Sequence, residues 1–269
     1  MNIMELFKNS LTYPADNWKQ LLILGVLTIL TTIFIVLEAV LELLGIGLNQ
    51  YLSAYILSTI SMIPVLVVGF IVSGYLLSVT KKTIANPEGE APEFELVTNI
   101  IEGIKVLILE IVYYIIPLLI ILLVAYFTGA FNYFYQIFTT AAATGSFDPI
   151  SNTLLGAAGT SFLEVVIVGW ILYLIFSILL LVARAKLAET GSLGEAINMV
   201  DVFNKIGEIG WGNFIIWLII YAIIVYLIAA AFVVVSAFVP IIGTIIAMLV
   251  ISPFVDMFAA RALGLIYTE

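Results

Sequence analysis

The nine basic residues of the chain all lie where a single side of a membrane can hold them. They occur before the first long apolar segment, between the second and third, between the fourth and fifth, and after the sixth: Lys8, Lys19, Lys81, Lys82, Lys105, Arg184, Lys186, Lys205 and Arg261. The alternate connections contain no base. Because Lys and Arg are retained on the cytoplasmic side, this distribution predicts six spans in a cell membrane, with both termini in the cytoplasm.

Composition agrees that lipid surrounds most of the chain. Of 269 residues, 64% are hydrophobic and 10% are charged, whereas a soluble domain has roughly a quarter charged residues. The net charge of −9 repels phosphate, so we expect no nucleic-acid partner. Cys and His are absent, which excludes disulfides, thiolate and imidazole metal sites, and a Ser-His catalytic pair. We expect neither a metal nor a cofactor.

The uncharged apolar segments are long enough to cross the ~30 Å hydrocarbon core as helices. The last of them, residues 209–255, would be about 70 Å long as one helix at about 1.5 Å per residue, so it must fold back, and Pro240 and Gly243 mark the reversal. The sequence therefore predicts an all-α, polytopic fold. Residues 1–269 form a single membrane domain with six transmembrane helices in three hairpins: 20–44, 51–79, 104–127, 161–182, 211–237 and 241–260.

The connections between spans differ in character. Three amphipathic segments, one before each hairpin, are predicted to lie as interfacial helices on the cytoplasmic face: 3–18, 93–103 and 192–208. Residues 88–95 carry four of the acids, and the stretch 81–95 around them contains two prolines and a glycine, which is typical of a surface loop. Residues 128–160 combine an aromatic run with small polar residues, and they are predicted to form an external loop or, alternatively, a shallow re-entrant turn.

Three stretches of sequence resemble a known family. They are LTYPADNW before the first span, IPVLVVGFIVSGYLL in the second, and ARAKLAETGSLGEAINMVDVFNKIGEIGW after the fourth. These are similar to the uncharacterised, mainly archaeal, multi-pass membrane family called domain of unknown function 4013. The resemblance implies a prokaryotic membrane protein. It brings no activity and no catalytic residue to any position.

Acids at membrane depth are the sharpest candidates for function, because an ionised carboxylate there costs roughly 2.5–3.5 kcal/mol. We predict an intramembrane polar site at Glu110 and Asp256, near Pro117 and Pro253. The prolines either free backbone carbonyls to line a site or only kink the helices. The acids either form structural pairs with Lys105 or Arg261, or bind a proton or cation.

A second acidic group is predicted near the opposite face, at Glu38, Glu42 and Glu164. The first two lie four residues apart and so share one helix face, where they repel each other unless solvated, protonated or bridged by a cation. The simpler interpretation is that these side chains reach headgroup water. Small residues four apart, Ala54 with Ser58 and Gly69 with Ser73, are expected to permit close helix contacts.

These observations favour a protein that is not an enzyme. The chain has no P-loop, no paired-His zinc helix and no nucleophile elbow, and Asp256 is its only aspartate at membrane depth, whereas an intramembrane aspartic protease needs two. The first hypothesis is a membrane scaffold or assembly factor that engages lipids, a partner protein or a second copy of itself. The alternative is a transporter of a small solute or cation that uses Glu110 and Asp256.

Overall fold

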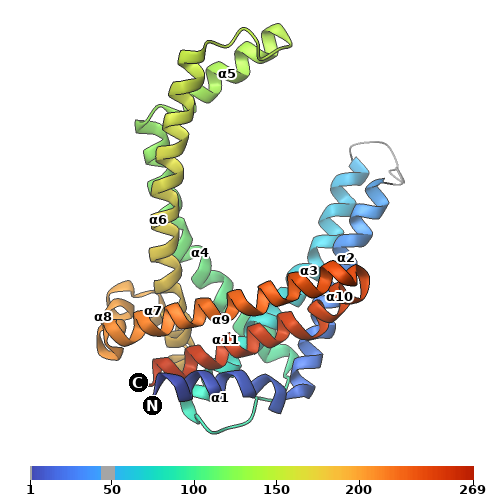
Figure 1. The fold of residues 1–269 in the computed structure, drawn as a ribbon, viewed down its shortest axis with the longest axis vertical. Helices are drawn as coiled ribbons and strands as arrows, with labels where there is room; N and C mark the ends of the chain where they lie inside the picture. The colour runs from blue at the N-terminus through green and yellow to red at the C-terminus, as the bar shows by residue number, and fades with distance from the viewer. Residues whose placement is uncertain (1, 44–51) are drawn as a thin grey trace. The chain divides into compact units, whose positions relative to one another are not determined.

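The computed structural model describes residues 2–43 and 52–269, and every regular element within them is a helix (Figure 1). In chain order these elements are α1 (Ile3–Asp16), α2 (Trp18–Leu43), α3 (Leu52–Ala85), α4 (Leu96–Phe127), α5 (Ala130–Thr144), α6 (Asn152–Thr190), α7 (Leu193–Ile197), α8 (Met199–Ile209), α9 (Trp211–Phe238), α10 (Pro240–Ile246), the π-helical turn η1 (Ala247–Ile251) and α11 (Ser252–Tyr267).

The chain divides into two compact units. The first comprises Met1–Ile108 and Val182–Glu269, and the second is Leu109–Leu181. Helices α4 and α6 each contribute residues to both units.

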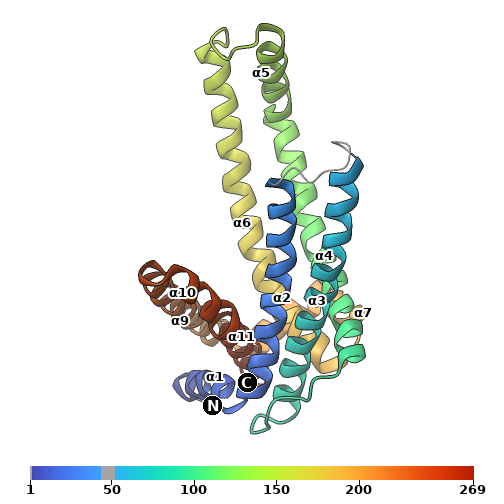
Figure 2. The ribbon, with the colours of Figure 1, turned by 90° about the vertical axis from the view of Figure 1, so that its right-hand side faces the viewer.

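Helix α11 lies at the centre of the first unit. It packs against α3, α1 and α2, while α2 packs against α3 and η1; α2 and α3 run side by side in both views (Figure 2). The buried core that joins these helices contains Leu24, Tyr75, Val79 and Met257. The N-terminal and C-terminal helices are thus held together through residues far apart in the sequence.

Glycine allows α3 and the start of α4 to cross at close range. A Cβ at Gly74 would overlap the backbone of Asn99, and a Cβ at Gly103 would overlap the backbone of Phe70. Gly69, which the small-residue spacing indicated as a contact, has no such neighbour within 4 Å. The side chains of Ala54 and Ser58 lie outside the residues whose surroundings the structure describes.

The second unit pairs α4 with α6 and includes α5. Tyr114 and Ser177 share a hydrogen bond of 3.1 Å, and the Ser161 hydroxyl donates to the Thr128 carbonyl at 2.8 Å. Gly129 adopts φ 75° between α4 and α5, and Gly145 adopts φ 67° at the end of α5. Two left-handed glycines therefore delimit a helix within the predicted external loop 128–160, and α6 begins inside that range as well.

The helices resemble the predicted spans but differ in their ends. Most of the predicted interfacial segment 93–103 belongs to the same helix as the predicted span that follows it, because α4 runs from Leu96 to Phe127. Segment 192–208 is divided into α7 and α8 by Asn198, whose side chain caps α8. Helix α6, with 39 residues, is longer than predicted. The reversal at Pro240 is present, since α9 ends at Phe238 and α10 begins at Pro240.

Five helices within the described ranges are long and apolar enough to cross a membrane. They cover Met62–Ala85, Leu96–Phe127, Asn152–Thr190, Trp211–Val234 and Ile242–Tyr267. The first predicted span corresponds to α2, whose apolar stretch Trp18–Ile33 is shorter. Six spans in three hairpins, and the orientation of the termini, stay predictions.

Candidate functional site

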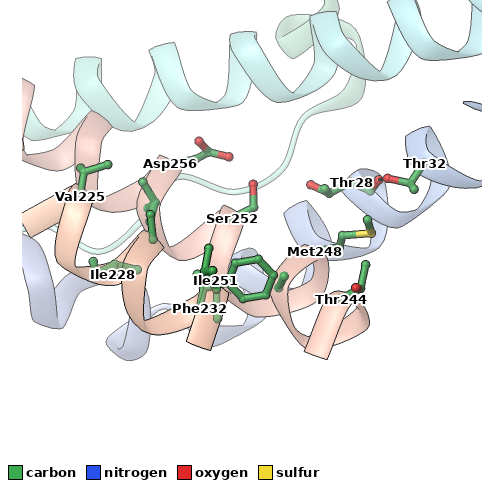
Figure 3. Close-up of a pocket in the computed structure, with 14 residues that line it drawn as sticks. Thr28, Thr32, Val225, Ile228, Phe232, Thr244, Met248, Ile251, Ser252 and Asp256 are labelled. Atoms are coloured by element: carbon green, nitrogen blue, oxygen red, sulfur yellow. Dashed lines mark hydrogen bonds between the residues drawn. The ribbon is translucent and has the colours of Figure 1, made fainter. Parts of the chain in front are cut away.

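A cavity of about 700 Å³ lies in the first unit between α2, α9 and the segment from α10 to α11. Its lining is mostly apolar, with one acid and four hydroxyl residues: Asp256, Ser252, Thr28, Thr32 and Thr244. In Figure 3 the Asp256 carboxylate, the Ser252 hydroxyl and the Thr28 hydroxyl lie along one side, and Phe232 lies across from them. The cavity therefore has polar groups gathered around Asp256 within a mostly apolar lining.

The wall that carries Asp256 is an irregular stretch of helix. Pro240 begins α10, η1 then widens the backbone to a π-helical turn, and Pro253 lies in the first turn of α11. A π-helical turn shifts the register of the following side chains relative to an α-helix, and such turns are frequent at functional sites. Ser252 and Asp256 are four residues apart on α11, which places both on the face that borders the cavity.

Asp256 is half-buried, and no side chain or backbone group in the described ranges forms a hydrogen bond or ion pair with its carboxylate. Tyr221 on α9 lies close enough to interact with it electrostatically, and Tyr221 also interacts with Arg184. The predicted structural pair with Arg261 does not form among these contacts. Asp256 thus faces the cavity with its charge available.

Arg261, five residues later on α11, is only 3% exposed and joins three segments. Its Nε donates to Asn9 Oδ1 of α1 at 3.0 Å, its Nη1 donates to Thr83 Oγ1 of α3 at 3.3 Å, and its Nη2 donates to the carbonyl of Pro87. The guanidinium also lies 4.5 Å from the ring centre of Tyr13. We call these five residues the Arg261 node.

The surroundings of Tyr13 change the pKa of its phenol. Burial raises the pKa of the Tyr13 phenol to about 12, and the positive charge of Arg261 offsets part of that increase. The phenol therefore stays neutral at ordinary pH, with its ring face toward the cation. Cation–π contacts of this kind contribute about 0.5–2 kcal/mol, more when desolvated.

The acidic loop, residues 86–95, is held against the first unit by its backbone. Besides the bond from Arg261 to Pro87, the Ala91 amide donates to Asn17 Oδ1 at 2.7 Å, Lys82 Nζ donates to the Ala91 carbonyl at 3.3 Å, and the Tyr75 hydroxyl donates to the Pro92 carbonyl at 3.2 Å. All four glutamates of the loop are exposed: Glu88, Glu90, Glu93 and Glu95. The loop thus presents its carboxylates outward from a fixed backbone.

The other predicted site residues lie elsewhere. Glu110, half-buried, and Pro117, buried, belong to α4 in the second unit, whereas Asp256 and Pro253 belong to the first. Neither proline lines the cavity. Lys105 forms its ion pair with Glu102, at 2.8 Å. Of the four residues predicted to form the intramembrane polar site, Asp256 therefore lines the cavity and the other three do not.

Of the predicted outer acidic cluster, the structure describes the surroundings of Glu164 alone. Glu164 is exposed on α6 in the second unit. The side chains of Glu38 and Glu42 lie outside the residues whose surroundings are described. Within the described ranges, no three acidic side chains come together as a metal site.

Sequence reasoning missed the hydroxyl side of the cavity and the Arg261 node. Thr28 and Thr32 donate to the carbonyls of Leu24 and Thr28 within α2, at 3.0 Å each, as threonines commonly do in apolar helices. Their spacing of four residues, and that of Ser252 and Asp256, was a signal for a shared polar face. Asn9 gave no signal, because its partner lies 252 residues away.

These features define a class: an all-helical, multi-pass membrane protein. Residues 56–252 match the model of the family described as "Protein of unknown function (DUF4013)", and the chain belongs to that family. Comparisons with curated proteins and with solved structures found no match. The resemblance seen in the sequence is thus confirmed, and the site must be interpreted from its own chemistry.

Proposed function

We propose that the protein is a non-enzymatic membrane scaffold whose acidic loop binds a basic surface of a partner protein. The observation that carries this proposal is that four hydrogen bonds hold the loop backbone while its glutamates are left exposed: Asn17 accepts one of these bonds, and Tyr75, Lys82 and Arg261 each donate one. A loop already held in one conformation loses less entropy on binding than a flexible one.

The exposed glutamates of the acidic loop require a partner whose surface carries several positive charges. Each exposed carboxylate contributes only about 0.2–1 kcal/mol to an ion pair, so several must act together. Removing three of them is expected to weaken binding by about tenfold or more, since tenfold corresponds to about 1.4 kcal/mol. Such an interaction weakens as salt is raised, because exposed charges are screened.

The test compares two triple variants purified in mild detergent. The loop variant is Glu88→Gln, Glu90→Gln, Glu93→Gln. The matched control, Glu5→Gln, Asp16→Asn, Glu195→Gln, removes three other exposed acids. A zero-length carboxyl-to-amine cross-linker then joins loop glutamates to lysines of the partner, and mass spectrometry identifies the joined peptides.

We expect one stoichiometric partner with the wild type and the control, joined through a lysine-rich segment, and at least a tenfold loss with the loop variant. Recovery of the protein alone, or a partner retained equally by the loop variant, contradicts the proposal.

Transport of a small solute or cation is the second candidate, and the cavity at Asp256 supports it. The role predicted for Glu110 has no comparable support, because the cavity residues do not include it. Flux into proteoliposomes that survives the double change Glu110→Gln and Asp256→Asn removes this mechanism. Flux that Asp256→Asn alone abolishes assigns it to the cavity.

A further inference from the structure

The size of the cavity at Asp256 suits an organic molecule. At about 700 Å³, it lies within the ~300–1,000 Å³ range typical of small-molecule sites. A metal ion instead requires several oxygens at about 2.0–2.6 Å. Among the described residues, one acid lines this cavity, and the three threonines and Ser252 supply the other side-chain oxygens.

The charge of the cavity selects the sign of the ligand. Asp256 has no hydrogen bond or ion pair within the described part of the chain, and it lies on a helix apolar enough to span the membrane. An ionised carboxylate in such surroundings costs roughly 2.5–3.5 kcal/mol. A ligand that places a positive charge beside it removes that cost, whereas an anionic ligand adds to it.

The apolar lining selects the remainder of the ligand. Phe232 of α9 and Ile251 of η1 lie across from the Asp256 carboxylate, while Val225 lies beside Asp256 and Met248 lies beside Thr28 (Figure 3). Aliphatic side chains favour apolar groups, a Met side chain adapts to irregular shapes, and a phenyl ring attracts a nearby cation.

We propose that this cavity is a binding site for a lipophilic organic cation, with its positive centre against Asp256 and its apolar groups against Phe232, Met248 and their neighbours. The inference goes beyond the acidic loop and deepens the transport candidate by naming the class of its ligand. It concerns binding at equilibrium, so a protein that binds such a cation without moving it leaves the inference intact and removes only transport.

The experiment uses the full chain in nanodiscs of zwitterionic lipid, with empty nanodiscs as the baseline. The probe is tetraphenylphosphonium, and tetraphenylborate has the same shape with the opposite charge. We expect saturable binding of tetraphenylphosphonium alone. Asp256→Asn is expected to weaken it at least tenfold, whereas Glu164→Gln, which removes an acid outside the cavity, changes it less than twofold.

A second variant separates loss of the site from loss of folding. Ala247→Phe keeps the acid and fills space, because Ala247 lines the cavity, and it is expected to weaken binding at least fivefold while the protein still elutes as a single species. No saturable binding to the wild type, equal binding of tetraphenylborate, or unchanged affinity in Asp256→Asn overturns the proposal.

Discussion

Two charged residues five positions apart on α11 differ in almost every respect. Arg261 is buried and satisfied by Asn9, Thr83 and Pro87 from three different segments. Asp256 borders a cavity, and the described residues offer it no hydrogen bond. A buried charge is tolerated only when its hydrogen-bonding capacity is filled. The helix therefore carries one charge that joins three segments of the fold and one that borders a cavity without a hydrogen bond from the described residues.

The chemistry of the two groups explains the difference. A guanidinium presents five N–H donors in a rigid planar fork, so a single Arg261 can hold α1, α3 and the acidic loop at once. A carboxylate has no donors, and its surroundings on the cavity side are apolar side chains and hydroxyls. Those hydroxyls include Thr28 and Thr32, which already donate to the backbone of α2.

Arg261→Met gives the largest expected effect on stability. Methionine keeps an apolar stem but removes every donor, which leaves Asn9 Oδ1 and the Pro87 carbonyl without this partner. We expect the free energy of unfolding to fall by roughly 2–4 kcal/mol, because hydrogen bonds from a charged group are worth about 1.5–3 kcal/mol and all three bonds of Arg261 are lost together. Denaturant titration in detergent, followed by the fluorescence of the buried Trp217, measures the change.

Two controls sharpen the contrast between the charges. Arg261→Lys keeps the charge without the fork and is expected to lie between the wild type and Arg261→Met. Asp256→Asn removes a carboxylate from an apolar setting, so it is expected to leave stability unchanged or to raise it. A loss with Asp256→Asn as large as that with Arg261→Met would mean that both charges are structural.

The elements of the fold were largely readable from the sequence. Uncharged runs and the break at Pro240 depend on local composition, so α3, α4, α6 and α9 overlap the predicted spans, although α6 extends well beyond its span at both ends. The left-handed glycines 129 and 145 delimit a helix inside the predicted loop, and its run of aromatic residues is equally typical of a membrane interface.

The candidate site was readable only in part, because it depends on contacts between distant segments. Asp256 was indicated as a candidate only by its expected depth in the membrane, and its place in the cavity was not predicted. The bases were interpreted through topology, which placed Arg261 just after the last predicted span. In the structure Arg261 lies inside α11, which continues to Tyr267, and topology said nothing of its partners Asn9 and Thr83. Small-residue spacing favoured Gly69, whereas the close crossing uses Gly74 and Gly103. The spacing defines a helix face and leaves open which helix lies against it.

Gly74→Ala tests how much stability depends on the close crossing of α3 and α4, for comparison with the loss expected at the Arg261 node. A methyl group there would overlap the backbone of Asn99, which cannot move aside like a side chain. We expect a loss of about 1–3 kcal/mol in unfolding free energy, as for other overpacked sites. The same denaturant titration measures it.

The matched control is Gly69→Ala on the same helix, where a Cβ meets nothing within 4 Å. That change is expected to stabilise the protein by about 0.5–1 kcal/mol through the higher helix propensity of alanine. Equal effects of the two substitutions would show that α3 and α4 do not cross at this point.

Tyr13→Phe gives the smallest expected effect, and it appears only at high pH. Burial raises the pKa of the Tyr13 phenol to about 12 from 10.0, so between those values the unfolded chain loses a proton that the folded protein keeps. Stability from this group is therefore complete below about pH 10 and declines as pH rises toward 12. Phenylalanine keeps the ring against Arg261 but cannot ionise, so unfolding curves from pH 9 to 12 should fall less steeply for Tyr13→Phe than for the wild type. Parallel curves would mean that the phenol reaches water and that the Arg261 node is more open than its hydrogen bonds indicate.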